Sequence, residues 1–201
     1  SSSNYPFLAT GVGIGNPYLK SVAAPESMAS LTELGDFVFK DCTALESITG
    51  FGHVESIGQY AFDGCTSLTN IGDAESGFKA VTSIGNKAFA NCSNLQSLAS
   101  FASVLTIGIR AFENCDALSG TTGMGSAYSQ LTPADWSRLG LSASFGAYAF
   151  EGCSFGAIDM DNYNVPPSIQ NTTFPGDPSD VIVFVSSMDG VLDSYRTDKG
   201  W

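Results

Sequence analysis

The chain has 201 residues, 43% of them hydrophobic and 14% charged, and its 20 acidic and 8 basic residues give a net charge of −12. This composition suits one folded domain, is too apolar for a disordered chain, and contains no apolar run long enough to span a bilayer. The negative charge and the scattered basic residues disfavour nucleic acid and anionic lipid as partners, since both would be repelled.

The N-terminal segment is polar and opens SSSNYPF, without the basic stretch and apolar core of a signal peptide. A start of this kind is also what remains when an export signal or anchor has been trimmed. Sparse lysine with abundant Gly, Ser, Thr and Asn is common in exported bacterial proteins. The glycines at 11–15 superficially suggest a phosphate loop, but Asn16-Pro17 breaks the chain at once, so we interpret them as a flexible entry.

A repeat centred on cysteine follows. Successive cysteines are separated by 23, 27, 23 and 38 residues, and a phenylalanine lies three residues before each. With cysteine as position 0, glycine recurs at −7 and apolar residues at −14, −11, −8, +3 and +6, which gives the unit F-x-x-V-x-x-I-G-x-x-A-F-x-x-C-x-x-L-x-x-I. A repeat of this length predicts a solenoid, because one unit cannot bury its own apolar side. The cysteines are Cys42, Cys65, Cys92, Cys115 and Cys153, and the phenylalanines are Phe39, Phe62, Phe89, Phe112 and Phe150.

Two further units lack the cysteine and carry Asn16 and Asp177 in its place. We therefore predict a single solenoid domain over the whole chain. Its parts are a degenerate N-terminal unit at 1–27, repeats at 28–160, and a degenerate repeat with a C-terminal cap at 161–201.

Extra residues fall between position +6 of one unit and position −14 of the next, which maps the insertions to one edge of a solenoid. The largest insertion spans 121–139. Within it, Thr132-Pro133 predicts the start of a short helix, with Trp136 facing inward.

Apolar residues at every third position predict a coil that turns corners. We expect a short strand at positions +3 to +6 and a second extended face at V-x-x-I-G. The glycine at −7 would permit a tight turn or a positive φ. The segment A-F-x-x-C is typical of a single helical turn that drops its phenylalanine into a stack of rings.

The segments IGQYAFDGCTSLTNI, IGNKAFANCSNLQSL and IGIRAFENCDAL resemble repeats of the BspA-like, treponemal-type leucine-rich repeat family of bacterial surface and secreted proteins. The ending resembles the family's terminal unit, with Tyr195 and Trp201 in place and Ser186 where proline is usual. The resemblance implies an α/β-type solenoid, a right-handed leucine-rich repeat superhelix with short parallel strands, single-turn helices and long loops. It also implies adhesion or protein binding by a secreted or surface-attached protein.

The cysteines have three possible roles. A metal site needs converging thiolates, usually as closely spaced pairs, and His53 is the only histidine. Cysteines in one column of a solenoid would lie about 5 Å apart, within the Cα window of a disulfide, but they would point in parallel. We favour a ladder of buried free thiols over disulfides and over a metal site.

Other candidates for chemistry are weak. We interpret His53 as a surface or loop residue, since no G-x-S-x-G motif accompanies it. Acids beside the Phe–Cys turn predict a solvated face in preference to a glycosidase pair. The oxygen-rich stretch 159–164 could hold calcium but lacks the glycine and glutamate of an EF-hand loop, so a chance polar loop is favoured. The acids beside the turn are Asp41, Asp63, Glu113 and Glu151.

The resulting hypothesis is a non-enzymatic, exported, monomeric protein without cofactor or metal that binds a host matrix protein or another cell-surface protein. Contacts are expected at Tyr128 and Trp136 in the insertion and at Asp73 and Glu75 in the loop at 72–77. The alternatives are a structural spacer domain of a larger surface protein and a glycan-binding accessory.

Overall fold

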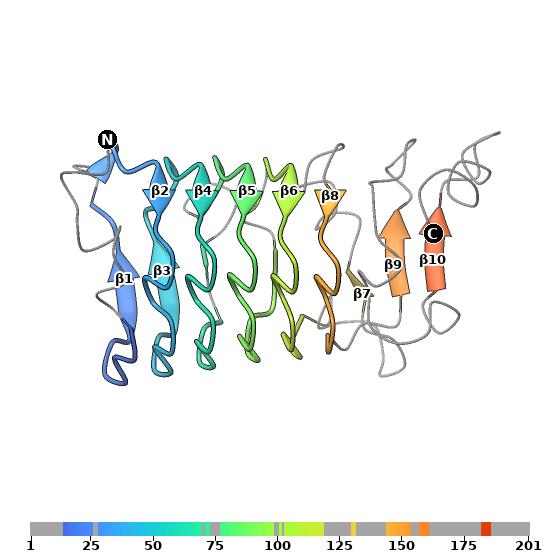
Figure 1. The fold of residues 1–201 in the computed structure, drawn as a ribbon, viewed down its shortest axis with the longest axis horizontal. Helices are drawn as coiled ribbons and strands as arrows, with labels where there is room; N and C mark the ends of the chain where they lie inside the picture. Colours follow the sequence, from blue (N-terminus) through green and yellow to red (C-terminus); the bar gives the residue numbers. More distant parts are fainter. Residues whose placement is uncertain are drawn as a thin grey trace.

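The computed structural model describes residues 14–25, 28–69, 71–72, 77–98, 101, 103–118, 130–131, 144–153, 157–160 and 182–185. Within them the regular elements are short strands paired in parallel, and the coils stack along one long axis (Figure 1). The predicted solenoid with short parallel strands is confirmed.

One flank of the solenoid is a five-stranded parallel sheet, the front sheet, with one two-residue strand from each coil (Figure 1). The residue at position −8 is buried in every strand and the residue before it faces outward, so the strands alternate as a sheet with one solvated face does. The strands follow in the order β2 (Glu33–Leu34), β4 (Ser56–Ile57), β5 (Ser83–Ile84), β6 (Thr106–Ile107) and β8 (Ser144–Phe145).

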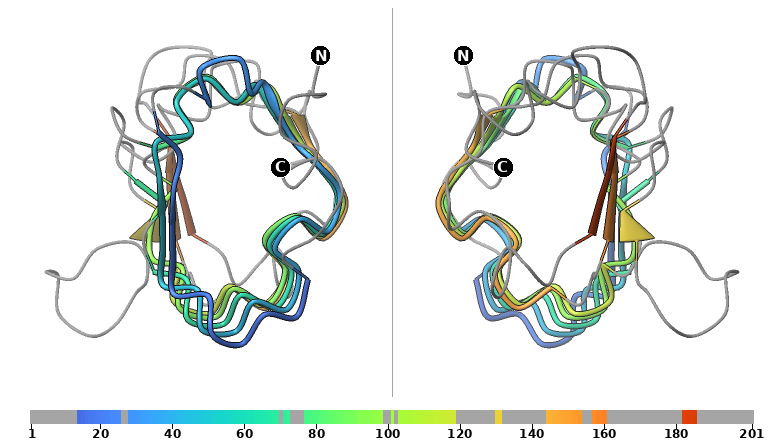
Figure 2. Two further views of the ribbon diagram at one scale, coloured as in Figure 1. Left: turned by 90° about the vertical axis from the view of Figure 1, so that its left-hand side faces the viewer. Right: turned by 90° about the vertical axis from the view of Figure 1, so that its right-hand side faces the viewer.

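The opposite flank, which Figure 2 shows across the coil from the front sheet, carries the strands that were expected at positions +3 to +6. Both predicted extended faces therefore exist, but only the front sheet is continuous. Between Thr49 and Gln130 the described residues of this second flank form no strand. Its strands are β1 (Ser21–Ala23) and β3 (Ser47–Thr49) at one end, and β7 (Gln130–Leu131), β9 (Ala157–Met160) and β10 (Ile182–Val185) at the other.

The large insertion contributes a strand to this second flank. Leu131 of β7 pairs in register with Ile158 of β9, the place that an uninterrupted repeat would fill from position +6. The extra residues therefore lie on both sides of β7, and the expectation that they all follow position +6 is wrong here. The helix predicted from Thr132 lies outside the described residues.

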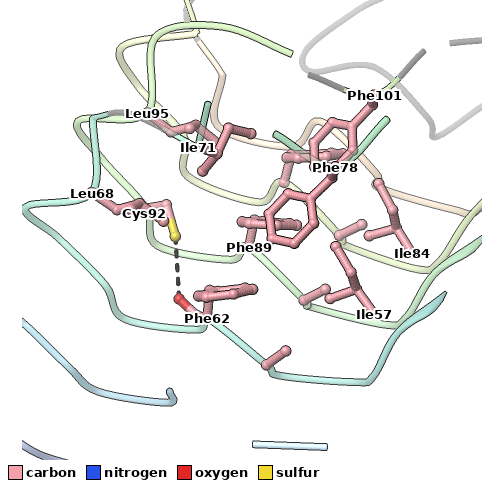
Figure 3. Packing of buried hydrophobic residues seen from close by; sticks show 14 of the residues in the cluster. Ile57, Phe62, Leu68, Ile71, Phe78, Ile84, Phe89, Cys92, Leu95 and Phe101 are labelled. Atoms are coloured by element: carbon pink, nitrogen blue, oxygen red, sulfur yellow. Dashed lines mark hydrogen bonds between the residues drawn. The ribbon is translucent and has the colours of Figure 1, made fainter. Parts of the chain in front are cut away.

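The core is built from columns of identical residue types. Phenylalanines at position −3 stack face to face, with ring centroids 4.9 Å apart for Phe62 and Phe89 and 5.4 Å apart for Phe89 and Phe112. A second column at position −14 stacks Phe78 on Phe101 at 5.7 Å, and Phe89 meets Phe101 edge-on (Figure 3). Stacked and edge-on pairs are the favoured aromatic geometries, so the rings tie each coil to its neighbours.

The segment A-F-x-x-C forms successive turns, and the predicted single helical turn is wrong in the described repeats. The amide of Phe62 donates to the carbonyl of Ala88 in the next coil at 2.7 Å, and the amide of Gly64 donates to Ala90 at 2.9 Å. Because these amides bond between coils, they are not available for the bonds to the fourth preceding residue that an α-helix requires.

The glycine at position −7 serves close packing and does not supply the positive φ that the sequence suggested. A Cβ built on Gly85 would lie 2.6 Å from the amide nitrogen of Gln59 and 2.7 Å from the carbonyl carbon of Gly58 in the preceding coil. The left-handed backbone occurs elsewhere in the turn, at positions −5 and −1.

Candidate binding surface

The five cysteines are free and buried in one column inside the solenoid. The thiol of Cys65 donates to the carbonyl of Phe39 in the preceding coil at 3.1 Å, and Cys92 donates to Phe62 at 3.2 Å (Figure 3). Cys115 and Cys153 repeat this contact at 3.1 Å. Burial raises the pKa of every one of these thiols, that of Cys153 to about 12.

The residues that the sequence nominated as ligand contacts are not tested. Tyr128, Trp136, Asp73 and Glu75 lie outside the described residues, as does the oxygen-rich stretch beyond residue 160. They stay predictions.

The described surface offers a different candidate at position −5, in the turn that follows each front-sheet strand. There, five successive coils place a large side chain on left-handed backbone, with φ between 54° and 61°. Large L-residues seldom adopt this conformation, which costs each of them about 1–2 kcal/mol. We call this column the outer ridge, and it consists of Phe37, Tyr60, Lys87, Arg110 and Tyr148.

Position −1 shows which residue types occur when left-handed backbone is the only requirement. Its φ values are also positive, and every residue there is Gly, Asp or Asn, the types that tolerate this conformation. The outer ridge uses none of them. Such strain persists where a particular side chain is needed, which makes the ridge a candidate for function. The residues at position −1 are Asp41, Gly64, Asn91, Asn114 and Gly152.

Ridge side chains pack on one another across the coils. The rings of Phe37 and Tyr60 stack with centroids 5.1 Å apart, and the Lys40 ammonium lies 5.5 Å from the Tyr60 centroid. The Arg110 guanidinium covers the Tyr148 ring at 4.9 Å. These contacts join the ridge side chains of neighbouring coils in two pairs, Phe37 with Tyr60 and Arg110 with Tyr148.

The cations at the ridge are neutralised by acids of position −2. Lys87 pairs with Glu113 at 3.1 Å, and Arg110 contacts both Glu113 and Glu151 at 3.5 Å. Lys40 pairs with Asp63, whose carboxylate also accepts a hydrogen bond from the Asn91 amide at 2.8 Å.

The expectation of solvated acids beside the Phe–Cys turn is therefore wrong for Asp63, which is only 7% exposed. The ridge together with Lys40 and these acids is close to electrically neutral on a protein of net charge −12, because three cations pair with three carboxylates: Lys40, Lys87 and Arg110 with Asp63, Glu113 and Glu151. The ridge residue Tyr148 is 38% exposed, and Ile109, which precedes Arg110 in the chain, is 48% exposed, so exposed apolar surface lies on and beside the ridge.

The remaining sequence candidates show no catalytic grouping in the described residues. His53 is exposed in a turn. Among described side chains, no three His, Cys, Asp or Glu lie close enough together to hold a metal ion. The described part of the chain also has no helix that is long and apolar enough to cross a membrane.

Sequence reasoning missed the ridge because position −5 varies from phenylalanine to lysine and shows no hydrophobic period. A signal was nevertheless available. Position −1 is restricted to Gly, Asp and Asn, whereas position −5, in the same short turn, holds only large side chains.

Comparison with known proteins gives three results. Residues 15–129 match the model of the BspA type leucine rich repeat region in six copies. Two solved structures are similar at 19% identity: a leucine rich cell surface protein from Faecalibacterium prausnitzii, with a TM-score of 0.42 over 84% of this chain, and a leucine-rich repeat protein from Bacteroides ovatus, with a TM-score of 0.40 over 86%. The match covers 61% and 57% of those chains. No curated protein matches.

Proposed function

Because the chain belongs to the BspA-type leucine-rich repeat family, we propose that it is a non-enzymatic module that binds another protein outside a bacterial cell. The outer ridge is the contact surface in this proposal. The observation that carries it is the column of large side chains that the fold holds on left-handed backbone at a cost in stability.

The composition of the ridge supports protein binding. Tyrosine and arginine are enriched among the residues that dominate protein interfaces. Arg110 and Tyr148 are already ordered against each other, so little side-chain entropy would be lost on binding. The ridge is also a neutral strip on an acidic protein, where a partner can approach without opposing the net charge.

The test measures binding of the purified chain to immobilised extracellular matrix proteins and to whole cells. Replacing Lys87, Arg110 and Tyr148 together by serine should reduce binding at least about tenfold, as expected for interface hot spots. The matched control replaces Lys20, Lys79 and Tyr18 by serine, which removes the same charges and one exposed tyrosine away from the ridge. Equal binding by both variants, with melting temperatures unchanged, would contradict the ridge as the contact surface.

The insertion at 121–139 is the second candidate for the contact surface. Deleting 122–136 would also remove β7 and its pairing with β9, so the sharper variant exchanges only Tyr128 and Trp136 for serine. Loss of binding in this variant alone would assign recognition to the insertion. No binding by the wild type to matrix proteins, cells or a glycan array would favour a structural spacer, and binding only to the array would favour a glycan-binding accessory.

A location outside the cell is part of the proposal and is supported by the low lysine content and the abundance of Gly, Ser, Thr and Asn. The division into an N-terminal unit at 1–27, repeats at 28–160 and a cap at 161–201 is likewise proposed. Limited proteolysis followed by mass spectrometry would test whether these parts behave as one domain.

A further inference from the structure

The cysteine column has a chemical property that does not depend on what the ridge binds. We propose that it is a redox latch, by which we mean that its thiols do not react with disulfide oxidants while the coils are stacked. When a coil opens, a disulfide forms between successive cysteines. This disulfide prevents the coil from stacking again until a reductant cleaves it.

In the stacked state the thiols are protected from oxidants, because they are buried and hydrogen-bonded. Cys92 and Cys115 are 0% exposed, and each thiol donates its proton to a phenylalanine carbonyl of the preceding coil. Burial also raises their pKa, which suppresses the thiolate that attacks a disulfide. An oxidant therefore has neither a path to the sulfur nor a reactive form of it.

Neighbouring thiols do not pair within the stacked column. Each sulfur is directed at the carbonyl of the preceding coil, so successive sulfurs point the same way instead of toward each other. A disulfide requires a defined Cβ–S–S–Cβ geometry with the two sulfurs about 2 Å apart. Forming one would break two of these hydrogen bonds and tilt two coils out of register.

An open coil removes both barriers. A disulfide between successive cysteines would close a loop of 23 to 38 residues. The entropy lost in closing such a loop is only slightly greater than for a shorter one. One thiolate attacks oxidised glutathione, forms a mixed disulfide and releases one glutathione thiolate. The next cysteine then attacks the mixed disulfide and releases the second glutathione, so two protein thiols are oxidised while one glutathione disulfide is reduced to two thiols.

The column has two ends, at Cys42 and at Cys153, and an end should open first, because each coil of a solenoid is held mainly by its neighbours. Cys153 is 5% exposed, whereas the other four cysteines are 0% exposed. The first disulfide expected is therefore the one between Cys115 and Cys153.

The experiment incubates the full chain with oxidised glutathione over a series of urea concentrations and maps the disulfides by mass spectrometry. Without urea, Cys92 should react about 10³-fold or more slowly than in the unfolded chain, and the rate should rise steeply with urea, because reaction requires opening. Chains with the Cys115–Cys153 disulfide should fail to regain the native circular dichroism until dithiothreitol is added.

Two controls keep the inference open to refutation. A Cys153→Ala variant should lose the first disulfide, while Cys92→Ala should retain it. Oxidation at a rate independent of urea, or a bridged chain with native spectrum and melting temperature, would overturn the latch. The readout uses only the purified chain and glutathione, so it stands whether or not the proposed binding activity is found.

Discussion

The carbonyl oxygen of Phe62 accepts a hydrogen bond from the thiol of Cys92 at 3.2 Å and another from the amide of Cys65 at 3.1 Å. One buried oxygen is thus satisfied from its own coil and from the next. The thiol is a second donor to an oxygen that the Cys65 amide already satisfies, and an additional hydrogen bond of this kind contributes about 0.5–1.5 kcal/mol, which gives cysteine a reason to occupy this position beyond filling space. The pair explains why the repeat marks its turn with a thiol that performs no chemistry in the folded state.

Replacing Cys92 by alanine should lower the free energy of unfolding by about 1–2 kcal/mol, because it leaves a small cavity and removes one hydrogen bond. The loss stays this small because the amide of Cys65 still donates to the Phe62 oxygen. Urea denaturation measures the change. Serine at the same position is the matched variant, since it keeps a donor. A loss well above this range, or a wild type whose melting shifts with dithiothreitol, would contradict a column of free thiols.

Replacing Phe89 by alanine should cost about 3–5 kcal/mol, as truncation of a large core side chain does. Its ring stacks on Phe62 and Phe112 and meets Phe101 edge-on, so three contacts are lost together. Phe89→Leu keeps most of the volume and should cost clearly less in the same urea titration. Equal losses for both variants would mean that ring stacking, not volume, dominates.

Gly85→Ala should destabilise the chain by at least about 2 kcal/mol, because the added Cβ would collide with backbone atoms of the preceding coil. Gly52→Ala is the control: its Cβ would lie 3.3 Å from the Cε atom of Lys79, which can move aside. Thermal melts of the two variants separate a backbone clash from a general effect of losing glycine. Similar melting temperatures would refute close packing as the role of position −7.

Tyr148→Asn tests whether the outer ridge is kept for stability or for binding. Asparagine relieves about 1 kcal/mol of left-handed strain, and the lost contact with Arg110 costs about as much, so stability should barely change. Binding to the partner found with the wild type should fall. If stability drops by several kcal/mol instead, the ridge is a structural element.

Alkaline pH should destabilise the chain through its thiols. Burial raises the pKa of Cys153 from 9.0 to about 12, so the folded state holds a proton that the unfolded state releases. The stabilisation is complete below pH 9.0 and is lost as pH rises from there to about 12, by about 1.4 kcal/mol per pH unit for this thiol. Urea titrations at several pH values should give a shallower dependence for Cys153→Ala than for the wild type. Parallel curves would contradict a raised pKa.

The described repeats show where sequence reasoning succeeds and where it stops. A period of about 23 residues with Phe, Cys and Ile in register predicted the parallel coils and the residues of the core, because identical columns can be buried only against each other. The same pattern misassigned the turn, since a segment such as AFDGC has local helical features while the amides of Phe62 and Gly64 bond to the next coil.

The sequence by itself therefore determined the repeat, the buried columns and the acidic surface of this protein. Only the tertiary structure decided that Gly85 is needed for close approach, that β7 enters the second flank, and that Tyr60 and Arg110 share one strained ridge. The physical reason is common to all three. Each depends on how neighbouring coils lie against one another, as in the approach of Gly85 to Gln59, the pairing of Leu131 with Ile158 and the packing of Arg110 on Tyr148. No local period encodes the distance between two coils.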